Sequence, residues 1–287
     1  EIGVRLVGSE MCIRDREYME TLKGLPVANA INEKIIEEMK DWNGAIPHLA
    51  IVRVGERPDD MSYERGATKK MEKVGFRCTS YTFPADIDND TFQKEFDKIN
   101  EDEDIDGILL LRPLPKHLDE KAIENRIASV KDLDGISPMN LAKVYAGDPT
   151  GYGPCTAEAV IEMLDYAGVD LKGKRAVVIG RSLVIGKPVA MMLMKKNATV
   201  TVCHTKTVDM PGVCKGAEVL VAAAGVAKMV DKSFVADGAV VIDVGINVDE
   251  DGNLCGDVDF EDVAENASVC TPVSYTHLRA HETDSYL

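Results

Sequence analysis

Apolar and polar residues alternate along the first half of the chain in helical and strand patterns. Apolar residues at helical spacing over 26–39 predict an amphipathic helix, and the apolar run over 48–54 predicts a strand. The pattern continues with predicted elements over 61–74, 79–83, 91–100, 107–111 and 118–130. Strands that alternate with helices predict a mostly parallel sheet covered on both faces, with ligand groups at the carboxyl ends of the strands.

The second half repeats this alternation after a segment rich in turn-forming residues. Glycine and proline are frequent between residues 135 and 154, which predicts a domain boundary there. A helix from Thr156 leads into a strand that starts at Lys174, and further strands are predicted over 199–203, 219–222 and 239–244. We therefore predict an α/β protein with two domains, over 17–153 and 154–272.

The stretch from Lys174 to Pro188 runs from an apolar strand through two glycines into the start of a helix. A helix N-terminus offers unpaired N–H groups and a positive dipole end, so it can hold the diphosphate of a dinucleotide. Gly180 lets the chain turn tightly after the strand, and Gly186 lets the backbone approach the ligand. Because the spacing is not G-x-G-x-x-G, an ordinary strand-turn-helix connection is the alternative.

Composition narrows the class of ligand and partner. The chain has 287 residues and a formal net charge of −16, so its surface repels nucleic acid and anionic membranes, and an anionic ligand needs a local basic or dipolar pocket. No apolar run approaches the roughly 20 residues that span a bilayer, and no secretory signal is visible. We expect a cytoplasmic protein without nucleic-acid or membrane partners.

The cysteines and the two ends of the chain say less about fold and function than the motifs do. The seven cysteines are widely separated and contain no C-x-x-C pair, so we expect reduced thiols, no disulfide framework and no metal site.

Segments 1–16 and 273–287 resemble translated sequencing-adapter DNA and lack periodicity, so we treat them as non-native, with a disordered tail as the alternative.

A set of short motifs is spread over both halves of the chain. The motifs are Ser62-Tyr63, 106–115, 131–135, 154–156, 180–182, 186–188, 203–205, 243–247 and Thr271-Pro272. Together they resemble the methylenetetrahydrofolate dehydrogenase family, many members of which are also methenyltetrahydrofolate cyclohydrolases. The resemblance covers about residues 22–272 and implies an N-terminal βα catalytic domain, a Rossmann-like NADP domain, a folate cleft between them and a homodimer.

The resemblance assigns folate binding to the first domain. Asp134 aligns with the family's pterin-binding aspartate, and a carboxylate can accept paired hydrogen bonds from an amino-pyrimidine edge. An Asx-turn or helix-cap role is the alternative for an aspartate before glycine. Tyr63 aligns with the tyrosine that packs against the folate ring, unless it is a core or interface residue. Pro113 and Pro115 resemble the prolines of the cleft wall.

Two positions depart from the pattern of bifunctional members, which carry Tyr-x-x-x-Lys and a glutamine before Leu-Pro-Leu-Pro. Here Ala67 and Leu111 stand at those places. In the family the lysine activates water for hydrolysis of the methenyl bridge, and the glutamine orients it. General acid–base catalysis supplies roughly 10²- to 10⁴-fold, so we predict weak or absent cyclohydrolase activity. Lys70, about 5 Å further along the helix and within about 20° of the Tyr63 face, is the alternative catalytic residue.

Dehydrogenation requires mainly that hydride donor and acceptor are positioned. Sheets that bind NAD usually carry an acidic side chain at the end of the second strand, whereas this strand ends at Cys203 and continues with His204, Thr205 and Lys206. NADP is therefore predicted and NAD is the alternative. We assign cofactor binding to Gly180, Arg181, Ser182, Gly186, His204, Thr205 and Ile246.

Two other functions remain open at this point. A shikimate-type NADP dehydrogenase would require a catalytic Lys-Asp pair, for which Lys131 with Asp132 or Asp134 is a loose match. The chain could also be a truncated fragment that dimerises but binds folate poorly. The family continues after Thr-Pro-Val with a Pro-Gly-Gly-Val-Gly loop and a closing helix, and neither follows Val273 here.

Overall fold

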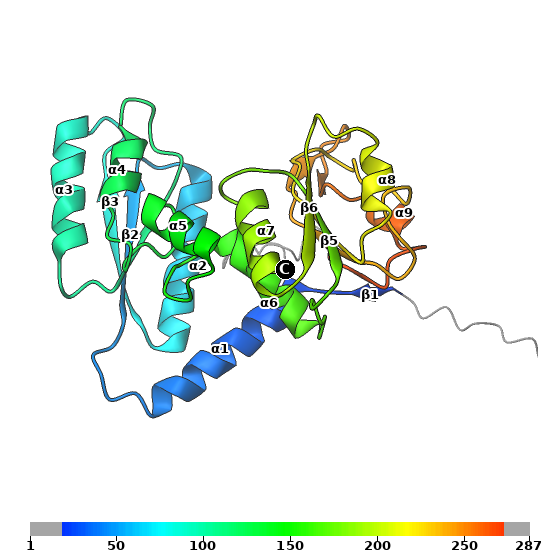
Figure 1. Cartoon of the computed structure of the whole chain (residues 1–287). Coiled ribbons are helices and arrows are strands. Elements are labelled where there is room, and N and C mark those ends of the chain that lie inside the picture. The colour runs from blue at the N-terminus through cyan, green and yellow to red at the C-terminus, as the bar shows by residue number, and fades with distance from the viewer. Residues whose placement is uncertain (1–18, 273–287) are drawn as a thin grey trace, which may run out of the picture.

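The computed structural model describes residues 19–272. The segments 1–16 and 273–287, which we predicted to be non-native, lie outside the described residues. Figure 1 shows two lobes, one built around β2 (His48–Val54) and the other around β5 (Arg175–Ile179). The predicted α/β architecture with two domains is confirmed.

The first sheet contains three parallel strands in the order β3-β2-β4. The chain passes from β2 to β3 (Arg77–Phe83) on one side and then to β4 (Gly107–Leu110) on the other. The carboxyl ends of β2 and β4 therefore form a topological switch point, which is where open α/β sheets bind ligands. The helix α2 (Pro58–Val74) leads from β2 to β3 and ends at Gly75, whose φ of 83° is left-handed, as in a common helix C-cap.

Helices cover both faces of this sheet. The face that carries Ile51 and Leu109 packs against α2. The opposite face, which carries Val52 and Leu110, packs against Phe92 and its neighbours. The covering helices there are α3 (Asn89–Glu101) and α4 (Glu120–Arg126), the latter shorter than the helix predicted over 118–130.

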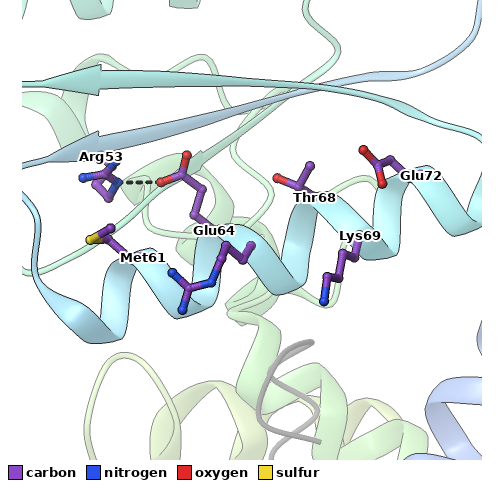
Figure 2. Close-up of a pocket in the computed structure, with 7 residues that line it drawn as sticks. Arg53, Met61, Glu64, Thr68, Lys69 and Glu72 are labelled. Carbon is purple, nitrogen blue, oxygen red and sulfur yellow. Dashed lines mark hydrogen bonds and ion pairs between the residues drawn. The ribbon is translucent and has the colours of Figure 1, made fainter. Parts of the chain in front are cut away.

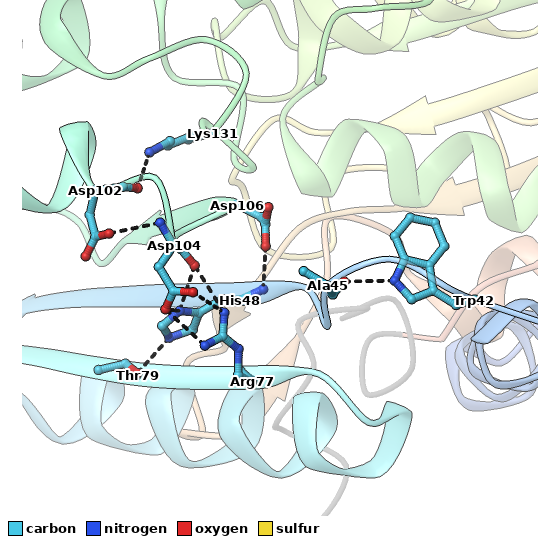
Figure 3. Close-up of polar contacts among 9 residues, drawn as sticks. All are labelled: Trp42, Ala45, His48, Arg77, Thr79, Asp102, Asp104, Asp106 and Lys131. Atoms are coloured by element: carbon cyan, nitrogen blue, oxygen red, sulfur yellow. Dashed lines mark hydrogen bonds and ion pairs between the residues drawn. The ribbon is translucent and has the colours of Figure 1, made fainter. Parts of the chain in front are cut away.

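A polar network closes the amino-terminal edge of the first sheet (Figure 3). The ring of His48 lies 2.9 Å from the carbonyl oxygen of Asp104 and 2.8 Å from Oγ1 of Thr79. Arg77 pairs with the Asp104 carboxylate at 2.7 Å, and the His48 N–H donates to Asp106. These polar groups at the amino ends of the strands form hydrogen bonds and an ion pair with one another. The carboxyl ends of the strands are therefore the edge that offers groups to a ligand.

The second sheet contains six parallel strands in the order β1-β11-β8-β7-β5-β6. From β5 the chain first adds β6 on one side and then β7 on the other, so the carboxyl ends of β5 and β7 form a second switch point. A separate hairpin joins β9 to β10. The strands are β1 (Glu20–Thr21), β6 (Thr199–Cys203), β7 (Val219–Ala222), β8 (Val240–Asp243), β9 (Asn247–Val248), β10 (Leu254–Cys255) and β11 (Val269–Cys270).

Two apolar layers enclose this sheet. Buried residues such as Val178 and Ile242 pack against α6 (Cys155–Tyr166) and α7 (Gly186–Lys195) on one face. On the other face Val177 and Val241 pack with residues near α8 (Met210–Cys214) and α9 (Phe260–Val263). The strands are buried on both sides, as expected for a parallel sheet between helices.

The structure departs from the predicted organisation in two places. β1 pairs with β11, so residues 20–21 belong to the second sheet although we predicted a first domain from residue 17. The helix α1 (Gly24–Lys40) runs diagonally beneath both lobes in Figure 1 and packs against α2 and α6. α5 (Pro138–Ala146) forms inside the segment predicted to be turns, with Ser137 accepting a hydrogen bond from the Asn140 N–H. The boundary at 153/154 stays a prediction.

The described residues hold no helix long and apolar enough to cross a membrane. Over the same range, 19–272, no group of histidine, cysteine, aspartate or glutamate side chains is arranged to hold a metal ion. The six cysteines in this range are free thiols.

Candidate active site at two sheet edges

The nucleotide edge of the second sheet begins where β5 ends. Gly180 adopts a φ of 123°, and its N–H donates to the carbonyl of Cys203 on β6. A Cβ at this position would overlap the Ala223 carbonyl at the end of β7. Only glycine therefore allows the loop to pass over the switch point between β5 and β7.

The loop then enters α7 without a side-chain cap at Ile185. The Ser182 hydroxyl instead accepts hydrogen bonds from the N–H groups of Ile185 at 3.0 Å and Gly186 at 3.4 Å. Arg181 and Ser182 are exposed. A Cβ on Gly186 would overlap the Gly180 carbonyl, so close packing of the turn against itself requires this glycine. That is a different reason from the approach to a ligand that we predicted.

The other predicted cofactor residues lie on loops after neighbouring strands. His204 follows β6, and its Nδ1 accepts a hydrogen bond from the Lys206 N–H at 3.1 Å. Thr205 is exposed beside it. Ile246 follows β8 and is 44% exposed. All these residues therefore stand at the carboxyl edge of one sheet, as the sequence predicted.

Two buried aspartates, which sequence reasoning did not assign, hold this edge together. Asp243, at the end of β8, accepts hydrogen bonds from the N–H groups of Gly245, Asp257 and Val258. Burial raises the pKa of Asp243 to about 7. Asp257 accepts hydrogen bonds from three consecutive N–H groups after β7, at residues 224–226. Their sequence signal was weak, because an aspartate at a strand end can equally be a ligand or a cap.

At the first sheet, α2 brings together the positions that distinguish bifunctional relatives. Ala67 is 5% exposed and Leu111 is 6% exposed, and both belong to one apolar cluster with Leu49, Ile51 and Leu109. Tyr63 packs against this cluster, as does Leu133. Ala67 and Leu111 are thus neighbours in space, and the environment between them is apolar.

α2 is continuous from Pro58 to Val74, so Lys70 does follow Tyr63 by two turns on one helix. Its side chain is half-buried. Met71, the next residue along the helix, packs against the apolar cluster. Lys70 therefore lies beside the face that holds Ala67 and one turn beyond it.

Two cavities of about 400 and 410 Å³ lie away from the predicted site residues. The first runs along α2, where Glu64 pairs with Arg53 at 2.5 Å (Figure 2). Lys69 lines this cavity, whereas Tyr63 and Lys70 do not. The second lies between α5, α6 and the C-terminal end of α7.

The Asp-Leu-Asp-Gly turn packs against the segment that leads into α6. Asp132 is fully buried and accepts hydrogen bonds from the N–H groups of Ile136 and Ser137 and from the Asn140 side chain. A Cβ on Gly135 would overlap the backbone of residues 152–154, which lead into α6. The turn is thus fixed by Asp132, which leaves the Asp134 carboxylate at the surface, 31% exposed.

Asp134 lies between groups from three elements. The Nη2 atom of Arg112, which follows β4, is 3.8 Å from its carboxylate. At the start of α6 the Cys155 thiol donates to the Leu133 carbonyl at 3.3 Å. Burial and the Asp134 carboxylate raise the pKa of that thiol. Of the cleft-wall prolines, Pro113 is exposed and Pro115 half-buried.

The loose Lys-Asp pair of the shikimate-type alternative does not form. Lys131 Nζ donates to the carbonyl oxygens of Asn100 and Asp102, at 2.9 and 2.6 Å. These acceptors lie towards the amino-terminal edge of the sheet, where Figure 3 draws Lys131 beside Asp102. Asp132 is buried in its own turn, so that assignment is wrong.

Comparison with known proteins decides the family. Residues 22–134 match the catalytic-domain model, and residues 154–276 the NAD(P)-binding-domain model, described as tetrahydrofolate dehydrogenase/cyclohydrolase. The chain belongs to the tetrahydrofolate dehydrogenase/cyclohydrolase family. The bifunctional protein FolD of Clostridioides difficile is 52% identical over 256 residues, covering 88% of this chain and 89% of the relative. That of Carboxydothermus hydrogenoformans is 50% identical, covering 88% and 90%.

Solved structures of this family have the same fold. The FolD enzyme of Campylobacter jejuni superposes with a TM-score of 0.86 at 34% identity, covering 92% of this chain and 95% of that one. The Trypanosoma brucei enzyme, solved with NADP and an inhibitor, gives a TM-score of 0.83 at 33% identity and covers 92% and 94%. The two sheet edges described above therefore belong to a member of the tetrahydrofolate dehydrogenase/cyclohydrolase family.

Proposed function

We propose that this protein oxidises 5,10-methylenetetrahydrofolate to the 5,10-methenyl form with NADP, and that its cyclohydrolase activity is weak or absent. Family membership supports the dehydrogenase reaction. The observation that carries the second part is the apolar cluster formed by Ala67 and Leu111 with their neighbours. An alanine and a leucine in such a place can neither transfer a proton nor hold a water molecule.

On this proposal the first-domain residues bind and orient the pterin. The exposed Asp134 carboxylate accepts two hydrogen bonds from the amino-pyrimidine edge, because its turn is already held by Asp132. Tyr63 offers an aromatic face that is packed in place by the apolar cluster. Pro113 and Pro115 form the stiff wall after β4.

On the same proposal the second-domain edge holds NADP. The turn from Gly180 to Gly186 fits a diphosphate, because no side chain at either glycine can fill the turn and α7 presents its N-terminus there. Arg181, Ser182, His204 and Thr205 would surround the adenosine ribose and its phosphate, and Ile246 would contact the cofactor beyond β8. When bound, NADP supplies C4 of its nicotinamide ring as the hydride acceptor.

The test follows absorbance during oxidation of methylenetetrahydrofolate, first with NADP and then with NAD, and afterwards the decay of the methenyl product. We expect faster turnover with NADP and a decay at the spontaneous rate, unchanged in Lys70→Ala. Faster turnover with NAD would overturn the cofactor assignment. Enzymatic decay that Lys70→Ala abolishes would instead establish the bifunctional alternative with Lys70 as the catalytic residue.

We also propose a cytoplasmic homodimer, which sedimentation measurements can check. The fragment hypothesis concerns residues beyond 272, outside the described part of the chain. Fusing the Pro-Gly-Gly-Val-Gly loop and closing helix after residue 272 tests it. A large gain in folate affinity would favour the fragment, whereas equal activity with and without this extension would show that the loop is dispensable for dehydrogenation.

A further inference from the structure

Arg112 is the least satisfied charged side chain near the folate edge. Its Nη1 atom lies 3.0 Å from Glu124 and 3.7 Å from Glu120, both on α4. Its Nη2 atom lies 3.8 Å from Asp134, which is beyond hydrogen-bonding distance. Its Nε atom is buried and has no hydrogen-bond partner among the described residues. A buried N–H without a hydrogen-bond partner costs free energy of folding. We therefore ask what the guanidinium gains in this position.

The backbone around Arg112 is held from two sides. Arg57, itself paired with Asp60, donates to the carbonyl oxygens of Arg112 and Pro113 at 3.2 and 3.3 Å. On the other side Glu120 accepts a hydrogen bond from the Leu114 N–H at 2.7 Å. The loop after β4 is therefore fixed, and the α4 glutamates tether one end of the guanidinium while its other end points to Asp134.

We propose that Arg112 is a positioning residue for folate: it orients the Asp134 carboxylate for the pterin without itself occupying the oxygens that accept the ligand's hydrogen bonds. The inference rests on the proposed function, in which Asp134 binds the pterin. A closer bidentate pair would occupy the oxygens that the ligand needs, whereas a cation at 3.8 Å supplies charge without competing for them.

The charges around Asp134 make this cation necessary. Asp132 lies two residues earlier, and the Cys155 thiol is adjacent on α6. Glu120 and Glu124 stand behind the guanidinium. Arg112 is thus the one cation among these four carboxylates, Asp132, Asp134, Glu120 and Glu124. Without it, the charged groups named here as neighbours of Asp134 would all be acidic. Repulsion from these acidic neighbours would then move the Asp134 carboxylate away from the position that the pterin needs.

The experiment compares the parent with Arg112→Met and Arg112→Lys, measuring kcat and the KM values for methylenetetrahydrofolate and NADP from pH 5.5 to 8.5. In Arg112→Met we expect the folate KM to rise about tenfold or more while the NADP KM is unchanged. Arg112→Lys should restore part of the folate affinity through its charge but not all of it, because lysine lacks the planar fork.

Arg77→Met is the matched control, because Arg77 also pairs with an aspartate but at the opposite edge of the same sheet. It should leave the folate KM at the parent value. Parent-like values in Arg112→Met would overturn the proposal, as would an equal rise of both KM values, which indicates a general structural role. If Arg112→Met does not fold, Arg112→Lys decides: a folate KM equal to the parent's rejects the proposal. A parent that does not oxidise methylenetetrahydrofolate at all would refute the proposed function instead.

Discussion

The two proposed binding sites draw on different parts of the chain. At the second sheet the proposed nucleotide site consists mainly of backbone: Gly180 and Gly186 shape the turn, and buried aspartates accept hydrogen bonds from the N–H groups of the loops. At the first sheet the proposed folate site consists of side chains, with Tyr63 and Asp134 held by a scaffold of other residues.

This difference explains at which edge a substitution can change the reaction that the protein catalyses. A backbone site tolerates changes in exposed side chains but not in its glycines, because the turn geometry itself is the site. A side-chain site can lose one reaction and keep another, since Ala67 and Leu111 can replace proton-handling groups without disturbing the sheet below them. We infer that substitutions at the first edge select which reactions occur, whereas those at the second edge decide whether the cofactor binds.

The largest expected effect comes from Gly180→Ala at the backbone edge. The added methyl group overlaps the Ala223 carbonyl at a φ of 123°. We expect NADP affinity to fall at least about a hundredfold and the free energy of unfolding to fall by about 3 kcal/mol. Gly173→Ala is the control, because Gly173 has a φ of 76° but open space around it. It should cost about 1 kcal/mol and leave NADP titrations unchanged. If the two variants had the same NADP affinity and the same free energy of unfolding, the geometry at Gly180 would not be what the second edge requires. The distinction between the two edges would then be lost.

At the side-chain edge, Asp134→Asn keeps the shape of the residue and removes its charge. We expect kcat/KM for methylenetetrahydrofolate to fall roughly 10- to 100-fold, because charge-assisted hydrogen bonds to the pterin are lost. The KM for NADP should not change. Asp148→Asn, in an exposed loop where Asp148 contacts Thr150, is the control and should match the parent. A variant that loses affinity for NADP and folate alike would show that Asp134 supports both edges.

The buried carboxyl group of Asp243 predicts a pH dependence of stability at the backbone edge. The pKa of Asp243 rises from an ordinary value of 3.8 to about 7 in the folded protein, chiefly through burial. The folded state therefore binds more protons than the unfolded state between these values, so the contribution of Asp243 to stability is present below about pH 4 and is lost as the pH rises through 7. The slope is at most about 1.4 kcal/mol per pH unit.

Urea unfolding of the parent and Asp243→Asn from pH 4 to 8 measures this term. The variant cannot titrate, so its stability should vary less steeply with pH over this window than that of the parent. Asp170→Asn, on an exposed turn, should keep the parent slope. If the parent and Asp243→Asn gave identical slopes, Asp243 would not be the group that titrates.

The smallest expected effect is a gain of function at the side-chain edge. The double variant Ala67→Lys and Leu111→Gln places a base and its partner where the apolar cluster now lies. We expect methenyl hydrolysis to rise about tenfold above the parent rate, with dehydrogenase activity retained. Ala67→Lys alone should lower stability by about 2 kcal/mol, because its amine has no polar partner in the cluster. A double variant without hydrolysis would mean that other residues also block the reaction.

Much of the fold was predictable from local patterns. The strand over 48–54 has the predicted bounds, and the helix over 61–74 ends at Gly75 as expected. These elements are set by periodicity and by residues with special φ values, which act locally. Capping by Ser137 and the burial of Asn140 produced α5, and the surrounding glycines and prolines concealed it.

For the candidate site, the sequence predicted which residues take part but not which of them contact one another. The sequence alone determined that Tyr63, Asp134 and the Gly180 turn were present and that Ala67 and Leu111 replaced two family residues, because identity and spacing are written in the chain. The tertiary structure decided that Ala67 and Leu111 meet in one apolar cluster and that Arg112 stands beside Asp134. It also placed β1 in the second sheet. Such contacts join residues far apart in sequence, and strand order and packing select them rather than local propensity.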